Sequence, residues 1–241
     1  MSQRLNYRKQ VGDLSWQGAV NAREICGNFY RMGRHEWVSA LGWQQMHEDG
    51  VRKVVDLRNP AEIQRREHDP AVPAASLAQI EMVNLPLETS GNERFEAVAV
   101  PYMNHTNMYQ LVCEEFGDQL RAVFENLANS HGSTVIHCSA GRDRSGLVAT
   151  LLLDLAGCGD QILRHDELAV RGINEWHRVS PRKHPYERFH EARELQGIID
   201  ERAQALREFC AWMGSTQAYL ERQDMDPKVI ERVRDLAQNS S

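Results

Sequence analysis

The sequence lacks a long hydrophobic run and an apolar segment near its N-terminus. The longest apolar run, LVATLLL from Leu147, is far shorter than the roughly 20 residues that a helix needs to cross a bilayer. The opening stretch, MSQRLNYRKQVGDLSW, has no apolar core of the kind found in secretory signals. We therefore predict a soluble protein without membrane insertion.

Cysteine is scarce, and no two cysteines stand in a C-x-x-C pair. The five cysteines are odd in number and scattered along the chain, so the sequence shows neither a zinc-binding cysteine motif nor a dithiol motif. Unpaired thiols suit a reducing compartment, which predicts a cytoplasmic protein. Three of these thiols are interpreted as inert core residues, namely Cys113, Cys158 and Cys210.

The chain also lacks an excess of positive charge. Its 28 Lys and Arg residues stand against 34 Asp and Glu residues, giving a net charge of -6. Nucleic acids and anionic membranes need a basic face, so neither is expected as the main partner. With 241 residues, 41% of them hydrophobic, the chain can bury a substantial core. Because no repeat or low-complexity linker is present, residues 1–241 are predicted to form a single domain.

Helix and strand patterns alternate through the first two thirds of the chain. Apolar residues at helical spacing before Gly50 predict a helix that ends at residue 49. Short β-branched runs predict a buried strand over Val51–Leu57 and a weaker one near Met82. A short helix over residues 60–67 is expected between these two strands.

A second strand and helix follow, and the remainder of the chain is helical in character. Apolar spacings of three and four predict an amphipathic helix over residues 108–127. The run STVIH predicts a strand over 133–137, and SGLVATLLLDLAG predicts a buried helix that ends at Gly157. From residue 160 onward several helices are expected, with breaks at Pro181, Pro185 and Gly214–Ser215 and a helix start at Asp226–Pro227. The fold class is therefore α/β, with a helical C-terminal part over residues 160–241.

The stretch VIHCSAGRDRSG places a cysteine between the predicted strand and the buried helix. A turn that contains Gly141 leaves backbone N–H groups free to converge at a helix N-terminus, where they attract an anion. Cys138 lies at the base of this turn, where the helix dipole and Arg144 favour the thiolate. Comparable settings lower a cysteine pKa to roughly 3.5–7.5.

The other residues of this stretch suit the binding of a phosphoryl group. Arg144 can bind two phosphate oxygens side by side, a geometry that lysine cannot copy. The Ser145 hydroxyl can donate to the sulfur, and His137 is expected to support the loop as a structural histidine. The predicted substrate-binding residues are Ser139, Ala140, Gly141, Arg142 and Ser145.

This pattern of a cysteine, five residues, an arginine and a serine resembles the signature loop of cysteine-dependent protein phosphatases. HCSAGRDRSG is similar to the loop of bacterial-type tyrosine phosphatases, relatives of the dual-specificity and lipid phosphatases, in which an aspartate directly precedes the arginine. NAREICGNFYRMG and VVDLRNPAEI look like the N-terminal segment and the Asp-Leu-Arg strand end of that group. The resemblance covers residues 21–157, the expected core, and thins over the helical part.

The resemblance implies a phosphatase fold with a central mixed sheet flanked by helices. It also implies a two-step reaction in which Cys138 takes the phosphoryl group as a phosphocysteine and water then releases inorganic phosphate. No metal and no cofactor are expected.

The proton donor for the leaving oxygen is less evident. Many relatives use an aspartate on a loop a few dozen residues before the cysteine, but residues 94–111 contain only Glu96 and His105 as titratable candidates and no aspartate. Asp143 is therefore the predicted acid, with Asp56 as a supporting or alternative acid. Two structural alternatives stay open: Asp143 could cap the helix beside it, and Asp56 could form an ion pair with Arg58 and Glu62.

Two classes of function follow from these residues. The first is a phosphomonoester hydrolase acting on phosphotyrosine in a protein or peptide, with phosphoserine, phosphothreonine and phosphoinositides as further substrates. Arg142 matches a basic position that lipid-directed relatives fill with lysine, so it could bind a second phosphate. The alternative is a phosphate-binding module that keeps the loop without catalysis.

Overall fold

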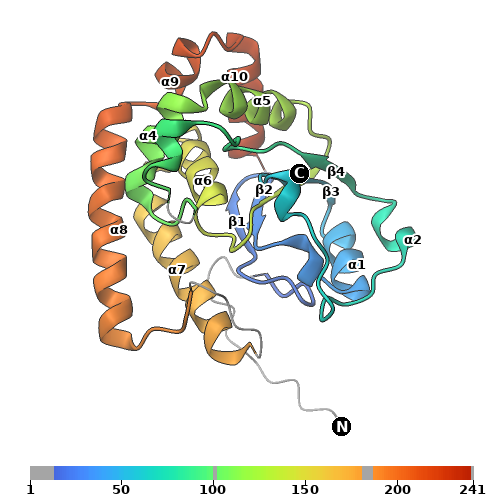
Figure 1. Ribbon diagram of the computed structural model, residues 1–241. Helices are drawn as coiled ribbons and strands as arrows, with labels where there is room; N and C mark the ends of the chain where they lie inside the picture. Colours follow the sequence, from blue (N-terminus) through green and yellow to red (C-terminus); the bar gives the residue numbers. More distant parts are fainter. Residues whose placement is uncertain (1–13, 100–101, 181–186, 240–241) are drawn as a thin grey trace.

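A five-stranded mixed sheet forms the centre of the molecule. The computed structural model describes residues 14–99, 102–180 and 187–239 (Figure 1). The strands run in the order β1-β2-β5-β3-β4. Only the β1–β2 pair is antiparallel; the other pairs are parallel. Their bounds are Arg23–Cys26 for β1, Phe29–Met32 for β2, Val51–Asp56 for β3, Glu81–Asn84 for β4 and Ser133–His137 for β5.

Helices cover both faces of the sheet, so its central strands are buried. All five residues of β5 are buried, as expected for a parallel strand covered on both faces. Helices α1 (Ala40–Glu48) and α2 (Ala74–Leu77) pack on one face. The other helices lie toward the opposite face or around it; they are α3 (Glu93–Glu96), α4 (Tyr109–Glu115), α5 (Gly117–Ala128), α6 (Arg144–Leu155), α7 (Ile162–Val179), α8 (Ala192–Met213), α9 (Thr216–Arg222) and α10 (Pro227–Gln238).

Most of the predicted elements are confirmed. Helix α1 ends before Gly50, whose φ of 85° needs glycine, and β3, β4, β5 and α6 lie where the patterns placed them. Helix α10 starts with Pro227 behind Asp226, whose side chain accepts a hydrogen bond from the Lys228 amide. The predicted break at Gly214 is also present, with φ at 73°. The breaks predicted at Pro181 and Pro185 lie outside the described residues.

Three expectations about local structure were wrong or incomplete. The helix predicted over 108–127 is two helices, because Phe116 leaves the helical region with φ at -126° and ψ at 36°. In place of a helix over 60–67, only a single 3₁₀ turn forms, at Pro60–Glu62. Strands β1 and β2, each four residues long, were not predicted.

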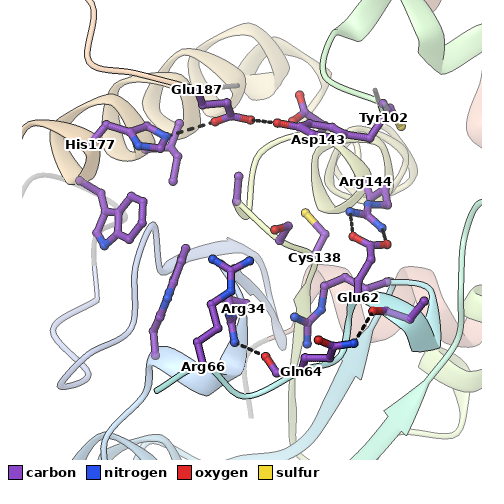
Figure 2. Close-up of a pocket in the computed structure, with 18 residues that line it drawn as sticks. Arg34, Glu62, Gln64, Arg66, Tyr102, Cys138, Asp143, Arg144, His177 and Glu187 are labelled. Carbon is purple, nitrogen blue, oxygen red and sulfur yellow. Dashed lines mark hydrogen bonds and ion pairs between the residues drawn. The ribbon is translucent and has the colours of Figure 1, made fainter. Parts of the chain in front are cut away.

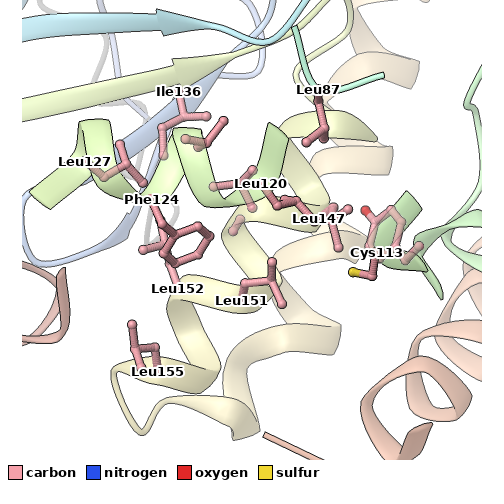
Figure 3. Packing of buried hydrophobic residues seen from close by; sticks show 14 of the residues in the cluster. Leu87, Cys113, Leu120, Phe124, Leu127, Ile136, Leu147, Leu151, Leu152 and Leu155 are labelled. Atoms are coloured by element: carbon pink, nitrogen blue, oxygen red, sulfur yellow. The ribbon is translucent and has the colours of Figure 1, made fainter. Parts of the chain in front are cut away.

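The apolar core fixes where β5 ends and α6 begins. Helix α6 is buried along most of its length, and Leu147, Leu151 and Leu152 pack among residues of β5 and α5 (Figure 3). This packing places residues 138–143 at the carboxyl end of the central strand, the edge where open α/β sheets bind ligands. Across the described residues, no helix combines the length and apolar character that a membrane span requires.

Candidate active site

The loop between β5 and α6 lies tightly against the end of β2. Gly141 adopts a φ of 66°, and a Cβ added there would stand 2.4 Å from the backbone carbon of Met32 and 2.5 Å from the amide nitrogen of Gly33. Only glycine fits this backbone conformation and this contact. The predicted turn at Gly141 is therefore present, and the loop follows the backbone of β2.

The carbonyl groups of the loop point outward. All five carbonyl oxygens from residues 139 to 143 accept hydrogen bonds from outside the loop. The donors, in order, are the Arg34 amide (2.9 Å), the Asn21 side chain for two carbonyls (3.1 and 3.0 Å), the Arg31 guanidinium (2.7 Å) and the Tyr109 hydroxyl (3.1 Å). Because the C=O and N–H of one peptide unit point in opposite directions, the amides of residues 140–144 face the other side. Such converging amides form a concave anion-binding site.

Asn21 holds two of these carbonyls from a conformation that is uncommon for a residue with a side chain. Its φ is 59°, in the left-handed region that costs free energy outside glycine. The side-chain amide also donates to the Ala169 carbonyl (3.1 Å), and its oxygen accepts from Arg23 (2.6 Å). This residue therefore ties the loop to α7, and its strain accompanies a positioning role.

Cys138 lies at the floor of a cavity of about 290 Å³ (Figure 2). Its side chain is buried, and its Sγ lies 3.5 Å from the Ser145 Oγ, as the predicted hydroxyl donor requires. Ser139, Ala140, Asp143 and Arg144 line the cavity with it. Of the other predicted binding residues, Gly141, Arg142 and Ser145 are not among the residues that line this cavity.

The Arg144 guanidinium is held by two carboxylates that the sequence did not assign to it. Its two terminal nitrogens donate to the Glu62 oxygens at 2.5 and 2.8 Å, and its Nε lies 3.2 Å from Glu88 Oε1. Burial alone would lower the pKa of Arg144, but Glu62, Cys138 and Glu88 together raise it. Burial raises the pKa of Glu88 to about 7. The guanidinium is therefore charged and fixed in orientation.

The Asp143 side chain is bonded to two arginines and does not cap the helix. Asp143 stands at the N-cap position of α6, yet its side chain makes no capping hydrogen bond, so the capping alternative is wrong. Arg142 Nε reaches its two oxygens at 3.2 and 3.0 Å, and Arg202 Nη1 donates to Oδ1 at 2.9 Å. Arg142 also contacts Glu187 at 3.1 Å. The carboxylate lines the cavity and is held in place from α8.

Asp56 lies behind the loop, away from the cavity lining. It accepts hydrogen bonds from Arg58 Nε (2.9 Å) and Nη2 (2.7 Å), and Arg58 also donates to Glu36 at 3.1 Å. Glu62, expected in this ion pair, binds Arg144 instead. Asp56 and Arg58 thus form the ion pair that the sequence offered as the structural alternative, with Glu36 in the place expected for Glu62.

His137 connects this ion pair to the loop. Its Nδ1 lies 3.2 Å from the Cys138 carbonyl oxygen, and its Nε2 lies 3.1 Å from His35 Nδ1 and 3.5 Å from Asp56 Oδ2. Complete burial lowers the pKa of His137 to about 4, despite the opposing charge of Asp56. The imidazole is neutral at pH 7 and has the structural role expected from the sequence.

Several cavity residues were missed because they come from distant segments. Trp37 and Trp176 stack with ring centroids 4.5 Å apart and both line the cavity. Glu187 joins them there and accepts from the Tyr102 hydroxyl at 3.0 Å. No local motif marks these residues, whereas Glu96 and His105, the acids considered upstream, are not among the lining residues.

The chain is similar to known tyrosine phosphatases over most of its length. The profile of the tyrosine phosphatase family matches residues 13–237. A protein assigned as a tyrosine-protein phosphatase in Cupriavidus necator is 28% identical over 178 residues, which cover 64% of this chain and 57% of that protein. A tyrosine-protein phosphatase of Nostoc commune is 50% identical over 40 residues, covering 16% of this chain and 14% of that protein.

The similarity of this chain to solved structures is weaker than its match to the family profile. The core catalytic domain of the PP-IP phosphatase SIW14 from S. cerevisiae has a TM-score of 0.38 at 14% identity, covering 80% of this chain and 93% of that one. P. aeruginosa TpbA has a TM-score of 0.32 at 15% identity, covering 82% of this chain and 98% of that one. Overlaps this low carry no information about substrates. The profile match spans nearly the whole sequence, and the chain therefore belongs to the tyrosine phosphatase family.

Proposed function

We propose that this chain hydrolyses phosphomonoesters through a phosphocysteine at Cys138. The observation that supports this most directly is that the loop carbonyls bond to groups outside the loop, which turns the opposite amides toward the side of Cys138 in the cavity. The thiolate attacks phosphorus and forms the S–P bond while the ester P–O bond breaks. The leaving oxygen takes a proton from Asp143. Water then gives a proton back to Asp143 and attacks phosphorus, the S–P bond breaks, and inorganic phosphate leaves while Ser145 donates to the departing thiolate.

Arg144 and the loop amides stabilise the charge on the phosphoryl oxygens in this reaction. A guanidinium has five N–H bonds; Glu62 accepts two of those of Arg144 and the Nε faces Glu88, so two N–H bonds of the terminal nitrogens remain for the phosphoryl group. Donors aimed in advance at a developing charge contribute about 3 kcal/mol each. In this proposal Glu62 is a positioning residue that sets the plane of the guanidinium.

Phosphotyrosine is the substrate that the cavity favours. The stacked pair of Trp37 and Trp176 gives one wall an aromatic surface, against which a phenyl ring packs better than the short side chain of phosphoserine. Arg142 is bonded to both Asp143 and Glu187, so binding a second phosphate there requires displacing a carboxylate. We therefore propose phosphotyrosine in proteins or peptides ahead of phosphoserine, phosphothreonine and phosphoinositides.

Steady-state hydrolysis of para-nitrophenyl phosphate and of a phosphotyrosine peptide tests the proposal. We expect turnover with the full chain, none with Cys138→Ser, and unchanged turnover with Cys113→Ser, whose thiol is buried in the core. Binding of phosphate by the Cys138→Ser protein shows that the cradle is intact. Turnover that survives the loss of Cys138 contradicts the thiolate mechanism, and phosphate binding without turnover in the unmodified chain favours the non-catalytic module.

A further inference from the structure

Three side chains from separate elements present nitrogen and oxygen donors to one point behind the signature loop. His35 precedes α1, Asp56 ends β3 and His137 ends β5. His35 Nδ1 lies 3.1 Å from His137 Nε2 and 3.8 Å from Asp56 Oδ2. His137 Nε2 lies 3.5 Å from Asp56 Oδ2. Two imidazoles and a carboxylate are a donor set that divalent zinc prefers.

The distances between these donor atoms suit a bound zinc ion. A circle through the three atoms has a radius of about 2.0 Å, and a point slightly off its plane is about 2.1 Å from each, the length of a zinc bond to nitrogen or oxygen. Only a small displacement of the ion from that plane gives tetrahedral geometry. The fold thus holds three ligands at the separations that a bound ion needs.

The surroundings of the three donors resemble the support that metal ligands have. The other ring nitrogen of His137 lies 3.2 Å from the Cys138 carbonyl, the kind of contact that orients metal-binding histidines. Arg58 fixes the Asp56 carboxylate. The His35 side chain is 20% exposed, so the fourth position can open toward solvent.

The local balance of charge also admits a cation. Three carboxylates and two guanidinium groups form the ion-pair network around the three donors. They are Glu36, Asp56 and Asp69 on one side and Arg34 and Arg58 on the other. Glu36 Oε2 lies 3.9 Å from His35 Nδ1, within reach of a zinc-bound water. The carboxylates of Glu36 and Asp56 thus offset the repulsion that Arg34 and Arg58 would exert on a dication.

We propose that His35, Asp56 and His137 form a zinc site behind the phosphate-binding loop. His35 binds through Nδ1 and keeps its hydrogen on Nε2, while His137 binds through Nε2. The ion takes no part in the proposed reaction. It replaces the hydrogen bond between the two rings with two coordination bonds, and it holds the loop through the contact of His137 with the Cys138 carbonyl.

Zinc titration of the metal-stripped Cys138→Ser chain tests this site, because that variant lacks the thiol most able to bind zinc at the cavity. Isothermal calorimetry should show one zinc ion per chain, and thermal unfolding should shift upward with zinc. Adding His35→Ala should weaken binding by at least about 100-fold, since loss of even a supporting contact costs 10- to 100-fold. His131→Ala, an exposed histidine elsewhere, should leave binding unchanged.

Cobalt titration of the Cys138→Ser chain provides a second readout that does not depend on folding of a ligand variant. Tetrahedral cobalt bound by nitrogen and oxygen should give intense visible bands without a thiolate charge-transfer band. His35→Gln, which retains a hydrogen-bonding side chain, should abolish these bands. Three results would each overturn the proposal. They are the loss of zinc binding when Cys138 is replaced, full zinc affinity after the His35 changes, and a cobalt spectrum typical of thiolate or octahedral coordination.

Discussion

Two ion-pair networks hold the signature loop, one on the side of the sheet and one on the side of helix α8. In the first a guanidinium and carboxylates meet a neutral histidine, and in the second a guanidinium lies between two carboxylates. On the sheet side, Asp56 and Arg58 form part of an ion-pair network that meets the neutral imidazole of His137. On the helix side, the single guanidinium of Arg202 lies between Asp143 and Asp166, with bonds of 2.7 to 3.0 Å. In the first network Arg58 is shared by Glu36 and Asp56, whereas in the second Arg202 is shared by Asp143 and Asp166 and Arg142 is a further partner of Asp143 only.

The two sides also act on different parts of the loop. The sheet side reaches the backbone, because His137 bonds to the Cys138 carbonyl and accepts the Leu57 amide at its own carbonyl (2.9 Å). The helix side reaches a side chain, because Arg202 orients Asp143. Damage to the sheet side should therefore shift the whole phosphate cradle, whereas damage to the helix side should act on the proposed acid and on the packing of α8.

The largest effect is expected from breaking the helix side with Arg202→Met. Arg202 is 1% exposed, and its removal leaves Asp166 buried without its ion-pair partner and Asp143 with Arg142 alone, which should cost about 3–5 kcal/mol of unfolding free energy. Urea unfolding measures this loss. Arg207→Met, at an exposed position of the same helix, serves as the control, and equal stability of the two variants would contradict the role of Arg202.

Arg144 lies between the two sides, and Arg144→Lys should lower kcat/KM by at least 100-fold, or about 2.7 kcal/mol. A lysine ammonium cannot keep the two parallel bonds to Glu62 and also bind the phosphoryl group side-on. Kinetics with para-nitrophenyl phosphate measure the change. Arg121→Lys, on the exposed surface of α5, should leave kcat/KM unaffected. A near-normal Arg144→Lys enzyme would rule out the bidentate role.

The substitutions Asp143→Asn and Asp56→Asn compare the two carboxylates that the sequence offered as the proton donor. Asp143→Asn should slow phenyl phosphate at least about ten-fold more than para-nitrophenyl phosphate, because only the poorer leaving group needs the proton. Asp56→Asn weakens a buried ion pair, so it should cost about 1–3 kcal/mol of stability and slow both substrates by the same factor. If the leaving-group dependence instead follows Asp56, the assignment of the acid must be reversed.

The smallest effect concerns pH, since each side contains one buried histidine. Burial lowers the pKa of His137 to about 4 and that of His165, which contacts Arg31, to about 3. Both folded values lie below the ordinary value of about 6.5. Their stabilising contribution is thus complete above pH 6.5 and is lost as pH falls, by about 1 kcal/mol per pH unit for each histidine.

Urea unfolding of the His137→Gln and His165→Gln variants between pH 7 and pH 3 separates these contributions. Each variant should depend less on pH than the unmodified chain, by a similar amount. Because the two folded pKa values differ, only the His165 contribution should continue to fall below pH 4. Identical pH profiles in all three proteins would show that neither histidine is buried in its neutral form.

The sequence predicted the parts of the site that are contiguous. Cys138, Arg144 and the strand and helix around them follow from one stretch, because the amides, Gly141 and the helix start lie within a few residues of one another. The apolar spacing predicted one helix where the structure has two, because this spacing continues unchanged across the break at Phe116 between α4 and α5.

The partners of the signature residues could not be predicted, because folding brings them from far along the chain. Glu62 bonds to Arg144 across 82 positions, and Arg202 to Asp143 across 59. A nearby arginine, Arg58, offered Glu62 an equally reasonable partner, and no local pattern distinguishes the two. Charge pairs of this kind depend on the packing of α6 and α8 and carry no periodic signature.

The outward-facing carbonyls of the loop have a consequence for the end of the catalytic cycle. Since five hydrogen bonds from other elements keep those carbonyls in place, the amides stay converged whether or not an ester is present. Free orthophosphate presents the same tetrahedron of oxygens, so it should compete with incoming ester and slow hydrolysis as it accumulates.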